Sequence, residues 1–114
     1  MKGLNYRPVS DSRGVFLPWV NDLRSSSGAY VIRAAGSGQI LYVGESHTGR
    51  LAKTIKRHFY AWKDDPIRRH FRYQPGRVEI AVRLCPPPSA AGAQNNLILR
   101  LDPRDNTNGP ERPF

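Results

Sequence analysis

Two short apolar runs on either side of a glycine-rich stretch constrain the fold of this chain more than any other feature. Residues 29–33 and 39–43 are rich in β-branched and aromatic side chains, which favour strands. Residues 35–38 between them carry two glycines, which tolerate positive φ, so the runs are expected to pair as a β-hairpin. Tyr30 and Tyr42 then share one sheet face if the turn uses three residues, and face apart if it uses two.

The rest of the chain alternates between helical and strand periods. Apolar residues recur every three or four positions over residues 50–62, which predicts a helix, and residues 77–84 alternate polar with apolar, which predicts a third strand. Ser89 is suited to cap a further helix that ends near Leu101. The expected architecture is therefore α+β, with the order β-β-α-β-α and a small antiparallel three-stranded sheet.

These elements divide the chain into three parts. At 114 residues there is room for one compact domain, which we place at residues 28–106. Residues 1–27 form an irregular arm, expected to pack on the domain because Phe16 and Trp19 are costly to expose. Residues 107–114 form a C-terminal tail rich in proline, asparagine and glycine.

Positive charge is the strongest global property of the chain. Eighteen lysines and arginines against nine acidic residues give a net charge of +9, and fourteen of the eighteen are arginine. The guanidinium fork matches phosphate oxygens, so this bias favours nucleic acid over an anionic membrane surface or simple solubility.

The single cysteine and the absence of long apolar segments limit the alternatives. Cys85 excludes an intrachain disulfide and a cysteine-based zinc site, and we expect it to be a buried, inert thiol. Without a signal peptide or a membrane-spanning segment, the expected protein is cytoplasmic, with no membrane partner and no obligatory protein partner.

Polar residues of the two predicted helices are candidates for a functional site. Arg50 opens the first helix, with His58 on the same flank, although a solvated basic helix face is the alternative interpretation. Gln94 lies on the apolar stripe of the second helix. A buried carboxamide without hydrogen bonds costs roughly 1–3 kcal/mol, so Gln94 marks either a site or a satisfied core glutamine. The basic residues expected to contact nucleic acid are Lys53, Lys56, Arg57, Arg68, Arg69 and Arg72.

These residues fall into a pattern that resembles the GIY-YIG nuclease superfamily. Gly28-Ala29-Tyr30 and Tyr42-Val43-Gly44 resemble its paired signature, Arg50 its helix arginine, and His58 the histidine that many members carry. The family's Ala-x-x-x-Glu-x-x-Leu-Ile stretch and its downstream Pro-x-x-Asn are matched by Ala90, Gln94, Leu97, Ile98, Pro103 and Asn106. The resemblance covers residues 28–106, with every piece in the right order.

The resemblance implies metal-assisted hydrolysis of phosphodiester bonds. One Mg²⁺ or Mn²⁺ ion, held by the family's glutamate, would stabilise charge on the scissile phosphate. Tyr30 would be the general base, which requires nearby cations to lower its pKa from about 10. Arg50 would lower that pKa and bind the phosphate, while Tyr42 and His58 would orient water or phosphate and assist proton transfer. Asn106 is expected to fix the loop after the last helix.

Two departures from the family pattern change what is expected of this chain. Arg50 follows Tyr42 two residues closer than in the family, so Arg57 is the alternative catalytic arginine. Gln94 stands at the position of the metal-binding glutamate, and a neutral amide holds a magnesium-type ion much more weakly than a carboxylate. Because glutamine is nearly isosteric with glutamate, folding and nucleic-acid binding should survive while hydrolysis falls sharply. Glu45 directly follows the Tyr42-Val43-Gly44 signature and is the carboxylate nearest in sequence to the expected site. Contact with the metal is one interpretation, and an ordinary salt bridge in the turn region is the role we expect.

Three hypotheses for the function remain open. The one we favour is a metal-dependent DNA endonuclease, acting on single-stranded or branched DNA, that Gln94 inactivates, whether the glutamine is natural or introduced. The second is a catalytically inactive nucleic-acid-binding module on the same fold. The third is an unrelated basic RNA- or DNA-binding protein whose tyrosines are core residues. Phe71 and Tyr73 could stack on unpaired bases, or could equally belong to the core.

Overall fold

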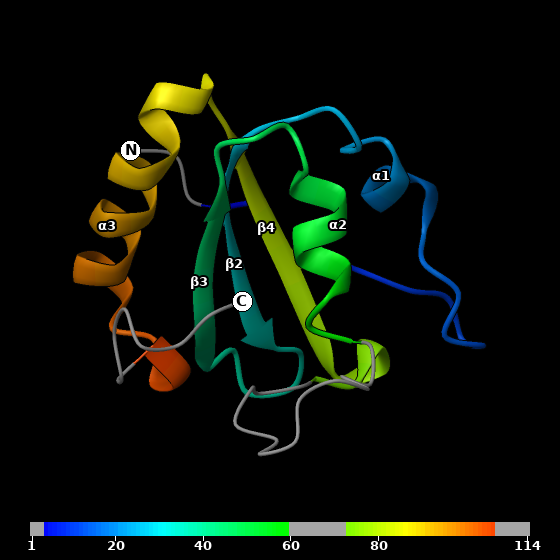
Figure 1. Ribbon diagram of the computed structural model, residues 1–114. Helices are drawn as coiled ribbons and strands as arrows, with labels where there is room; N and C mark the ends of the chain where they lie inside the picture. Colours follow the sequence, from blue (N-terminus) through cyan, green and yellow to red (C-terminus); the bar gives the residue numbers. More distant parts are fainter. Residues whose placement is uncertain (1–3, 60–72, 107–114) are drawn as a thin grey trace, which may run out of the picture.

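Four antiparallel strands in the order β1-β4-β2-β3 form the centre of the fold. The computed structural model describes residues 4–59 and 73–106, and Figure 1 shows α1 and α2 on one side of the sheet and α3 on the other. The helices and strands run in the order β1 (Arg7–Pro8), α1 (Pro18–Asn21), β2 (Gly28–Ala34), β3 (Ile40–Ser46), α2 (Leu51–Lys56), β4 (Val78–Leu84) and α3 (Ala90–Leu101). Three short 3₁₀ turns complete the order, at η1 (Pro75–Arg77), η2 (Pro87–Ser89) and η3 (Arg104–Asn106).

The sheet has one more strand than the sequence predicts. β1 lies in the segment expected to be irregular, where Arg7 pairs with Ile80 and Pro8 pairs with Glu79. Proline has no N–H to donate, which is tolerated here because β1 is an edge strand. A two-residue strand is too short to show alternation in the sequence, so the prediction of three strands is wrong in this respect.

The hairpin of β2 and β3 places both signature tyrosines on one face of the sheet. Tyr30 pairs with Gly44 and Ile32 pairs with Tyr42, after which the register shifts by one residue. The turn, residues 35–38, therefore contains four residues rather than the two or three considered from the sequence, since the Ala34 N–H binds the Gln39 carbonyl. Beyond the shift, the strands pair as they would after a three-residue turn, because Leu41 is one extra residue on β3. Tyr30 and Tyr42 therefore share a face.

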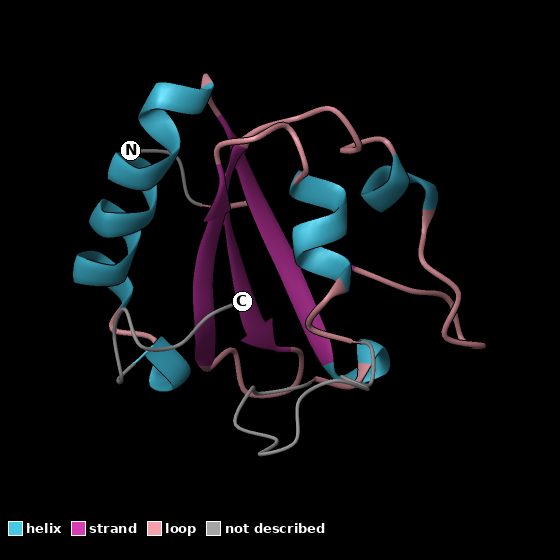
Figure 2. Cartoon of the chain, viewed as in Figure 1, coloured by secondary structure: helices cyan, strands magenta, loops and turns pink. Residues whose placement is uncertain are grey.

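Helices cover both faces of the sheet (Figure 2), and each face has its own hydrophobic core. The face under α2, here called the α2 face, buries Tyr30, Ile32 and Tyr42 against Leu51 and Ile55. Its outer rim includes Phe16 and Trp19, which are partly buried against this core. The opposite face, here called the α3 face, packs Ala29, Val31, Val43 and Leu97 together. A polar group therefore lies near the tyrosines only if it comes from the α2 face or from a strand edge.

The helices differ in detail from their predicted bounds. α2 ends at Lys56 and continues as a hydrogen-bonded turn to Phe59, while the predicted helical residues 60–62 lie outside the described residues. Ser89 precedes α3, but its side chain makes no capping hydrogen bond, because η2 leads into the helix. Cys85 is half-buried rather than buried. Within the part of the chain that the structure describes, no helix has the length and apolar character to cross a bilayer.

Candidate functional site

Tyr30, Tyr42 and His58 form a buried cluster on the α2 face of the sheet. The Tyr30 hydroxyl lies 2.7 Å from His58 Nε2. The His58 ring centroid lies 4.8 Å from that of Tyr42 and 5.6 Å from that of Tyr30, and all three side chains are buried. His58 reaches the tyrosines because the chain turns inward at the end of α2, so the structure brings together three of the four residues expected to be catalytic.

The two glycines of the hairpin signature are explained by close backbone approach. The Tyr30 ring lies directly over Gly44 on the neighbouring strand, where an added Cβ would come 2.5 Å from Tyr30 Cζ. An added Cβ at Gly28 would come 2.9 Å from Leu84 Cα across the β2–β4 pair. Any larger residue would displace the strand or the ring, so glycine at position 44 is needed for the position of Tyr30.

Burial makes the tyrosines of the cluster harder to ionise than a tyrosine in water. It raises the pKa of Tyr30 well above its usual value of 10, and the nearby Tyr42 adds to this effect. Burial also raises the pKa of Tyr42 to about 12. In both cases the cation that opposes the rise is Arg57. The expectation that Arg50 lowers the pKa of Tyr30 is therefore wrong, because Arg50 lies exposed at the start of α2.

The hydrogen bond between Tyr30 and His58 can run in either direction. The raised pKa keeps the proton on the Tyr30 phenol, which donates to Nε2 where the imidazole ring proton lies on Nδ1 and accepts where that proton lies on Nε2. In the first arrangement His58 is positioned to accept the Tyr30 proton. Burial disfavours a free phenolate at this site in both arrangements.

A second hydrogen-bonded group supports the cluster from the C-terminal side, and the sequence did not indicate it. The Tyr73 hydroxyl donates to Asp105 Oδ2 over 2.7 Å, and Arg104 binds the same carboxylate through two nitrogens, at 2.8 and 2.9 Å. The Tyr73 N–H donates to the His58 carbonyl over 2.8 Å. Tyr73 is buried, which favours the core interpretation over base stacking. Tyr73 and Asp105 are 32 positions apart, so no local pattern could have paired them.

Asn106 binds the edge of β3 next to Tyr42. Its Oδ1 accepts from the Val43 N–H at 2.8 Å, and its Nδ2 donates to the Val43 carbonyl at 2.9 Å. The side-chain amide thus occupies the place that another strand would take at this edge. The prediction that Asn106 fixes the loop after the last helix is confirmed by these contacts.

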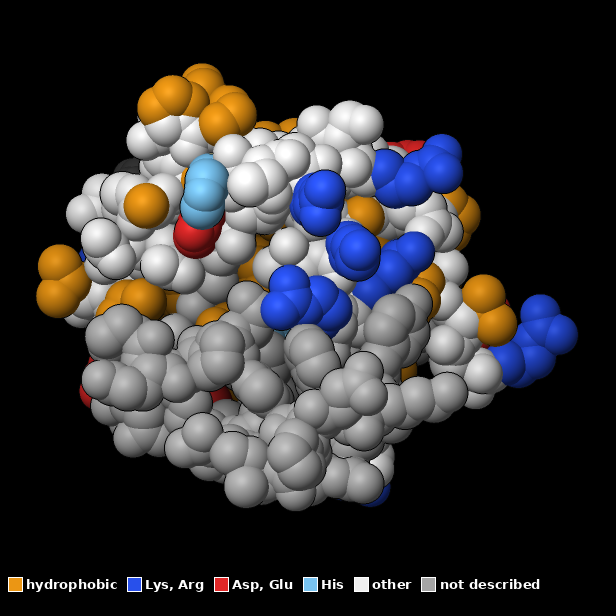
Figure 3. Space-filling view, viewed as in Figure 1, with side chains coloured by type: hydrophobic (Ala, Val, Ile, Leu, Met, Phe, Trp, Pro, Cys, Tyr) orange, Lys and Arg blue, Asp and Glu red, His pale blue; other side chains and the backbone are white. Residues whose placement is uncertain are grey.

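Basic side chains gather on the face of the molecule where α2 lies (Figure 3). Arg50 and Lys53 are exposed, and Arg57 is half-buried. Lys56 is half-buried as well, since its ammonium donates to Asn21 Oδ1 and lies 5.3 Å from the Phe16 ring centroid. The remaining residues predicted to contact nucleic acid, and with them Phe71, lie outside the described residues; they are Arg68, Arg69 and Arg72.

Gln94 lies on the other side of the sheet. It occupies the sheet-facing stripe of α3 and is half-buried. Because α3 packs on the α3 face, Gln94 does not share a face with Tyr30, although α2 and α3 both border the edge strand β3. Glu45, which directly follows Gly44 of the hairpin signature, contacts His47, whose Nδ1 lies 3.1 and 3.2 Å from the two carboxylate oxygens. This contact is an ion pair only where the imidazole is protonated.

The donor set around position 94 does not fit the divalent ion that the resemblance implies. Gln94 offers a neutral amide oxygen, whereas hard cations such as Mg²⁺ and Mn²⁺ prefer carboxylates. In residues 4–59 and 73–106, no group of three histidine, cysteine, aspartate or glutamate side chains is placed to hold a metal. The Glu45 carboxylate is already paired with His47.

No protein-family model matches the chain, and no curated protein matches it in sequence. The site must therefore be interpreted from its own geometry.

Proposed function

We propose that this chain is a GIY-YIG-type nuclease domain that binds DNA and whose hydrolytic activity is impaired by Gln94. The observation that carries the proposal is the buried cluster of Tyr30, Tyr42 and His58, with Arg57 close enough to oppose the rise in both tyrosine pKa values. Side chains whose pKa values are shifted by burial together with a nearby charge cluster at functional sites. The net charge of +9 and the basic side chains over α2 supply attraction for phosphate.

Arg57, Tyr30 and His58 each have a role in this proposal. Arg57 is half-buried at the end of α2, directly before His58, and is the cation that opposes the rise in both tyrosine pKa values, so it replaces Arg50 as our choice for the catalytic arginine. Burial disfavours the phenolate, so Tyr30 would take a proton from an attacking water that reaches its buried hydroxyl only as its own proton passes to His58. A carboxylate at position 94 would offer a divalent ion an oxygen ligand, and that ion would stabilise charge on a phosphate bound at the edge strand β3, which α2 and α3 both border.

A second candidate is a DNA-binding module without catalysis on the same fold. Two observations favour it, namely the neutral amide of Gln94 and the raised pKa of Tyr30. The two candidates agree on binding and differ on what a carboxylate at position 94 would do. In both of them the strand lies along the basic surface over α2.

The salt dependence of DNA binding tests the part of the proposal that both candidates share. Lys53 is exposed on α2, and Lys53→Gln should lower the slope of log K against log salt by about 0.7–0.9, the loss of one phosphate contact. Arg13→Gln removes one charge from the exposed loop before α1 and should leave the slope unchanged. Fluorescence anisotropy with labelled DNA measures both. Equal slopes for the two variants would refute an interface over α2.

A further inference from the structure

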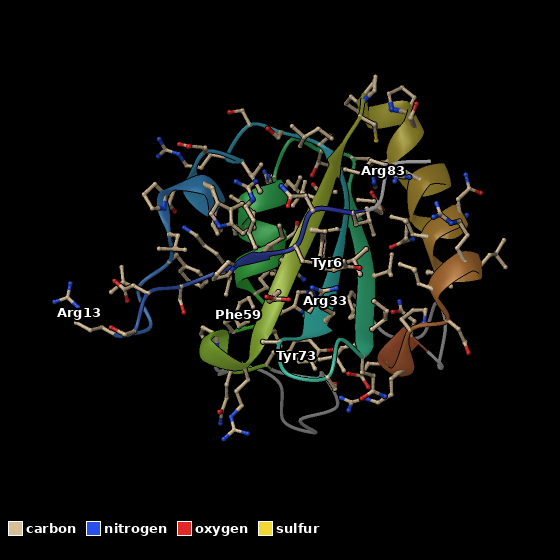
Figure 4. The ribbon with its side chains drawn as sticks, turned by 180° about the vertical axis from the view of Figure 1, so that it is seen from behind. Tyr6, Arg13, Arg33, Phe59, Tyr73 and Arg83 are labelled. Atoms are coloured by element: carbon tan, nitrogen blue, oxygen red, sulfur yellow. The ribbon has the colours of Figure 1, made fainter. Side chains whose placement is uncertain are left out.

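A broad surface depression, here called the cavity, lies at the end of the sheet that carries the β2–β3 turn. Its volume is about 570 Å³, within the range of sites that hold small organic ligands. Tyr73 forms part of its wall, and Figure 4 shows Tyr73 at this end of the sheet, far from Arg13. Among the described residues, the polar part of the lining comes from Ser37, Gln39, Gln74, Arg77 and Arg104, and the apolar part includes Leu41 and Val78.

The backbone of the cavity wall is held by defined hydrogen bonds. The Ala35 N–H in the hairpin turn donates to the Arg77 carbonyl over 3.0 Å, which joins the turn to η1. The Arg77 N–H donates to the Gln74 carbonyl over 2.9 Å. Leu41, the residue that the register shift leaves without a partner across the hairpin, also lines the cavity. The irregularity of the hairpin thus contributes to the cavity.

The charge of the lining selects for an anion. Arg77 and Arg104 both line the cavity, and its described lining contains no acidic side chain. Arg77 is exposed, whereas Arg104 is fixed in place by its two hydrogen bonds to the buried Asp105. The exposed Arg77 guanidinium beside the exposed hydroxyl and amide groups of Ser37, Gln39 and Gln74 suits a phosphate, whereas Leu41 and Val78 belong to the buried core behind the lining.

The cavity adjoins the tyrosine cluster through a shared residue. Tyr73 lines the cavity, and its ring centroid lies 5.8 Å from that of His58. A ligand in the cavity would therefore lie one side chain away from His58. A nucleic-acid strand that places a phosphate near Arg57 could continue into the cavity with a neighbouring nucleotide.

We propose that this cavity holds one nucleotide of a single-stranded nucleic acid, with Arg77 bound to its phosphate. The inference rests on the proposed function and extends it, because it names the strandedness of the substrate. A depression of about 570 Å³ is large enough for a single nucleotide, and a nucleotide can enter it only when it is unstacked from its neighbours, as in a single strand. The exposed lining offers one guanidinium, from Arg77, together with hydroxyl and amide groups.

Two pairs of variants test the cavity by charge and by volume. Gly36 lines the cavity, has no positive φ and has open space where a Cβ would stand, so Gly36→Trp should fill the cavity and Gly36→Ala should not. Arg77→Glu reverses the charge at the cavity, and Arg13→Glu makes the same change far from it (Figure 4). The probe is a fluorescein-labelled strand of about ten thymidines, with binding followed by anisotropy. Gly36→Trp and Arg77→Glu should weaken its binding roughly tenfold, and the two controls less than about twofold.

The outcomes separate this inference from the proposed function. If Lys53→Gln weakens binding while Arg77→Glu and Gly36→Trp match their controls, the cavity proposal is overturned and the interface over α2 stands. Equal loss of affinity for duplex and single-stranded probes would also overturn it. If the unchanged chain binds no DNA, the proposed function is refuted, and the cavity proposal with it. If Gly36→Trp does not fold, as judged by circular dichroism, the comparison of Arg77→Glu with Arg13→Glu alone tests the cavity proposal.

Discussion

Replacing Gly44 with alanine should disrupt the tyrosine cluster, because the Tyr30 ring occupies the space that the new side chain needs. The added Cβ would come 2.5 Å from Tyr30 Cζ, about 1 Å closer than carbon atoms normally approach. Tyr30 is fully buried between β3 and β4, so its ring has little room to move. Overpacking of this kind costs about 1–3 kcal/mol. Loss of the hydrogen bond to His58 adds about 1 kcal/mol, so Gly44→Ala should lower the free energy of unfolding by roughly 2–4 kcal/mol.

Urea unfolding of matched variants measures this effect. Gly92 lies exposed on α3 with open space around it, so Gly92→Ala should raise the free energy of unfolding by up to about 1 kcal/mol through helix propensity. The two glycine-to-alanine changes should therefore have opposite signs. Tyr30→Ala removes the ring and with it the clash. The double variant with Gly44→Ala should therefore lose less free energy of unfolding than the sum of the losses in the two single variants. Additive losses, or a Gly44→Ala protein as stable as the unchanged chain, would show that the ring does not lie over this glycine.

Two further changes test the surroundings of the cluster. Asn106→Ala removes both hydrogen bonds to Val43 and should lower the free energy of unfolding, measured by urea denaturation, by roughly 1–3 kcal/mol. Asn95 is exposed, so the control Asn95→Ala should not lower it. Equal effects of the two changes would contradict the role of Asn106 at the strand edge. Unfolded tyrosine ionises near pH 10 and folded Tyr42 near 12, so the folded state binds the extra proton in that window and stability should fall as pH rises through it. Tyr42 alone should contribute up to roughly tenfold per pH unit to the folding equilibrium, and a Tyr42→Phe protein with an unchanged pH dependence would contradict its raised pKa.

The parts of the fold with strong periodicity could be predicted from the sequence, and the parts set by long-range contacts could not. The hairpin, the strand β4 and the helix α3 follow the predicted pattern, since apolar residues mark their buried faces. β1 has only two residues, and its pairing with β4 joins positions that are far apart in the chain. The network of Tyr73 and Asp105 is non-local in the same way.

The candidate site shows the same division. The Tyr30 and Tyr42 signature and His58 were chosen by resemblance, and the structure places their rings in contact. The choice between Arg50 and Arg57 depends on which way each side chain points from a short helix, and spacing alone did not resolve it. The pKa of Tyr30 was expected to be low, and burial makes it high, because the sequence does not reveal how completely a side chain is covered.

Cleavage of labelled single-stranded and duplex DNA with Mg²⁺ or Mn²⁺, comparing the unchanged chain with Gln94→Glu, tests the central claim most directly. We predict that only the Gln94→Glu protein cuts, that it needs the divalent ion, and that adding Tyr30→Phe abolishes the cutting. If both proteins bind DNA and neither cuts, the chain is a binding module and the assignment of Gln94 to a disabled metal site is wrong.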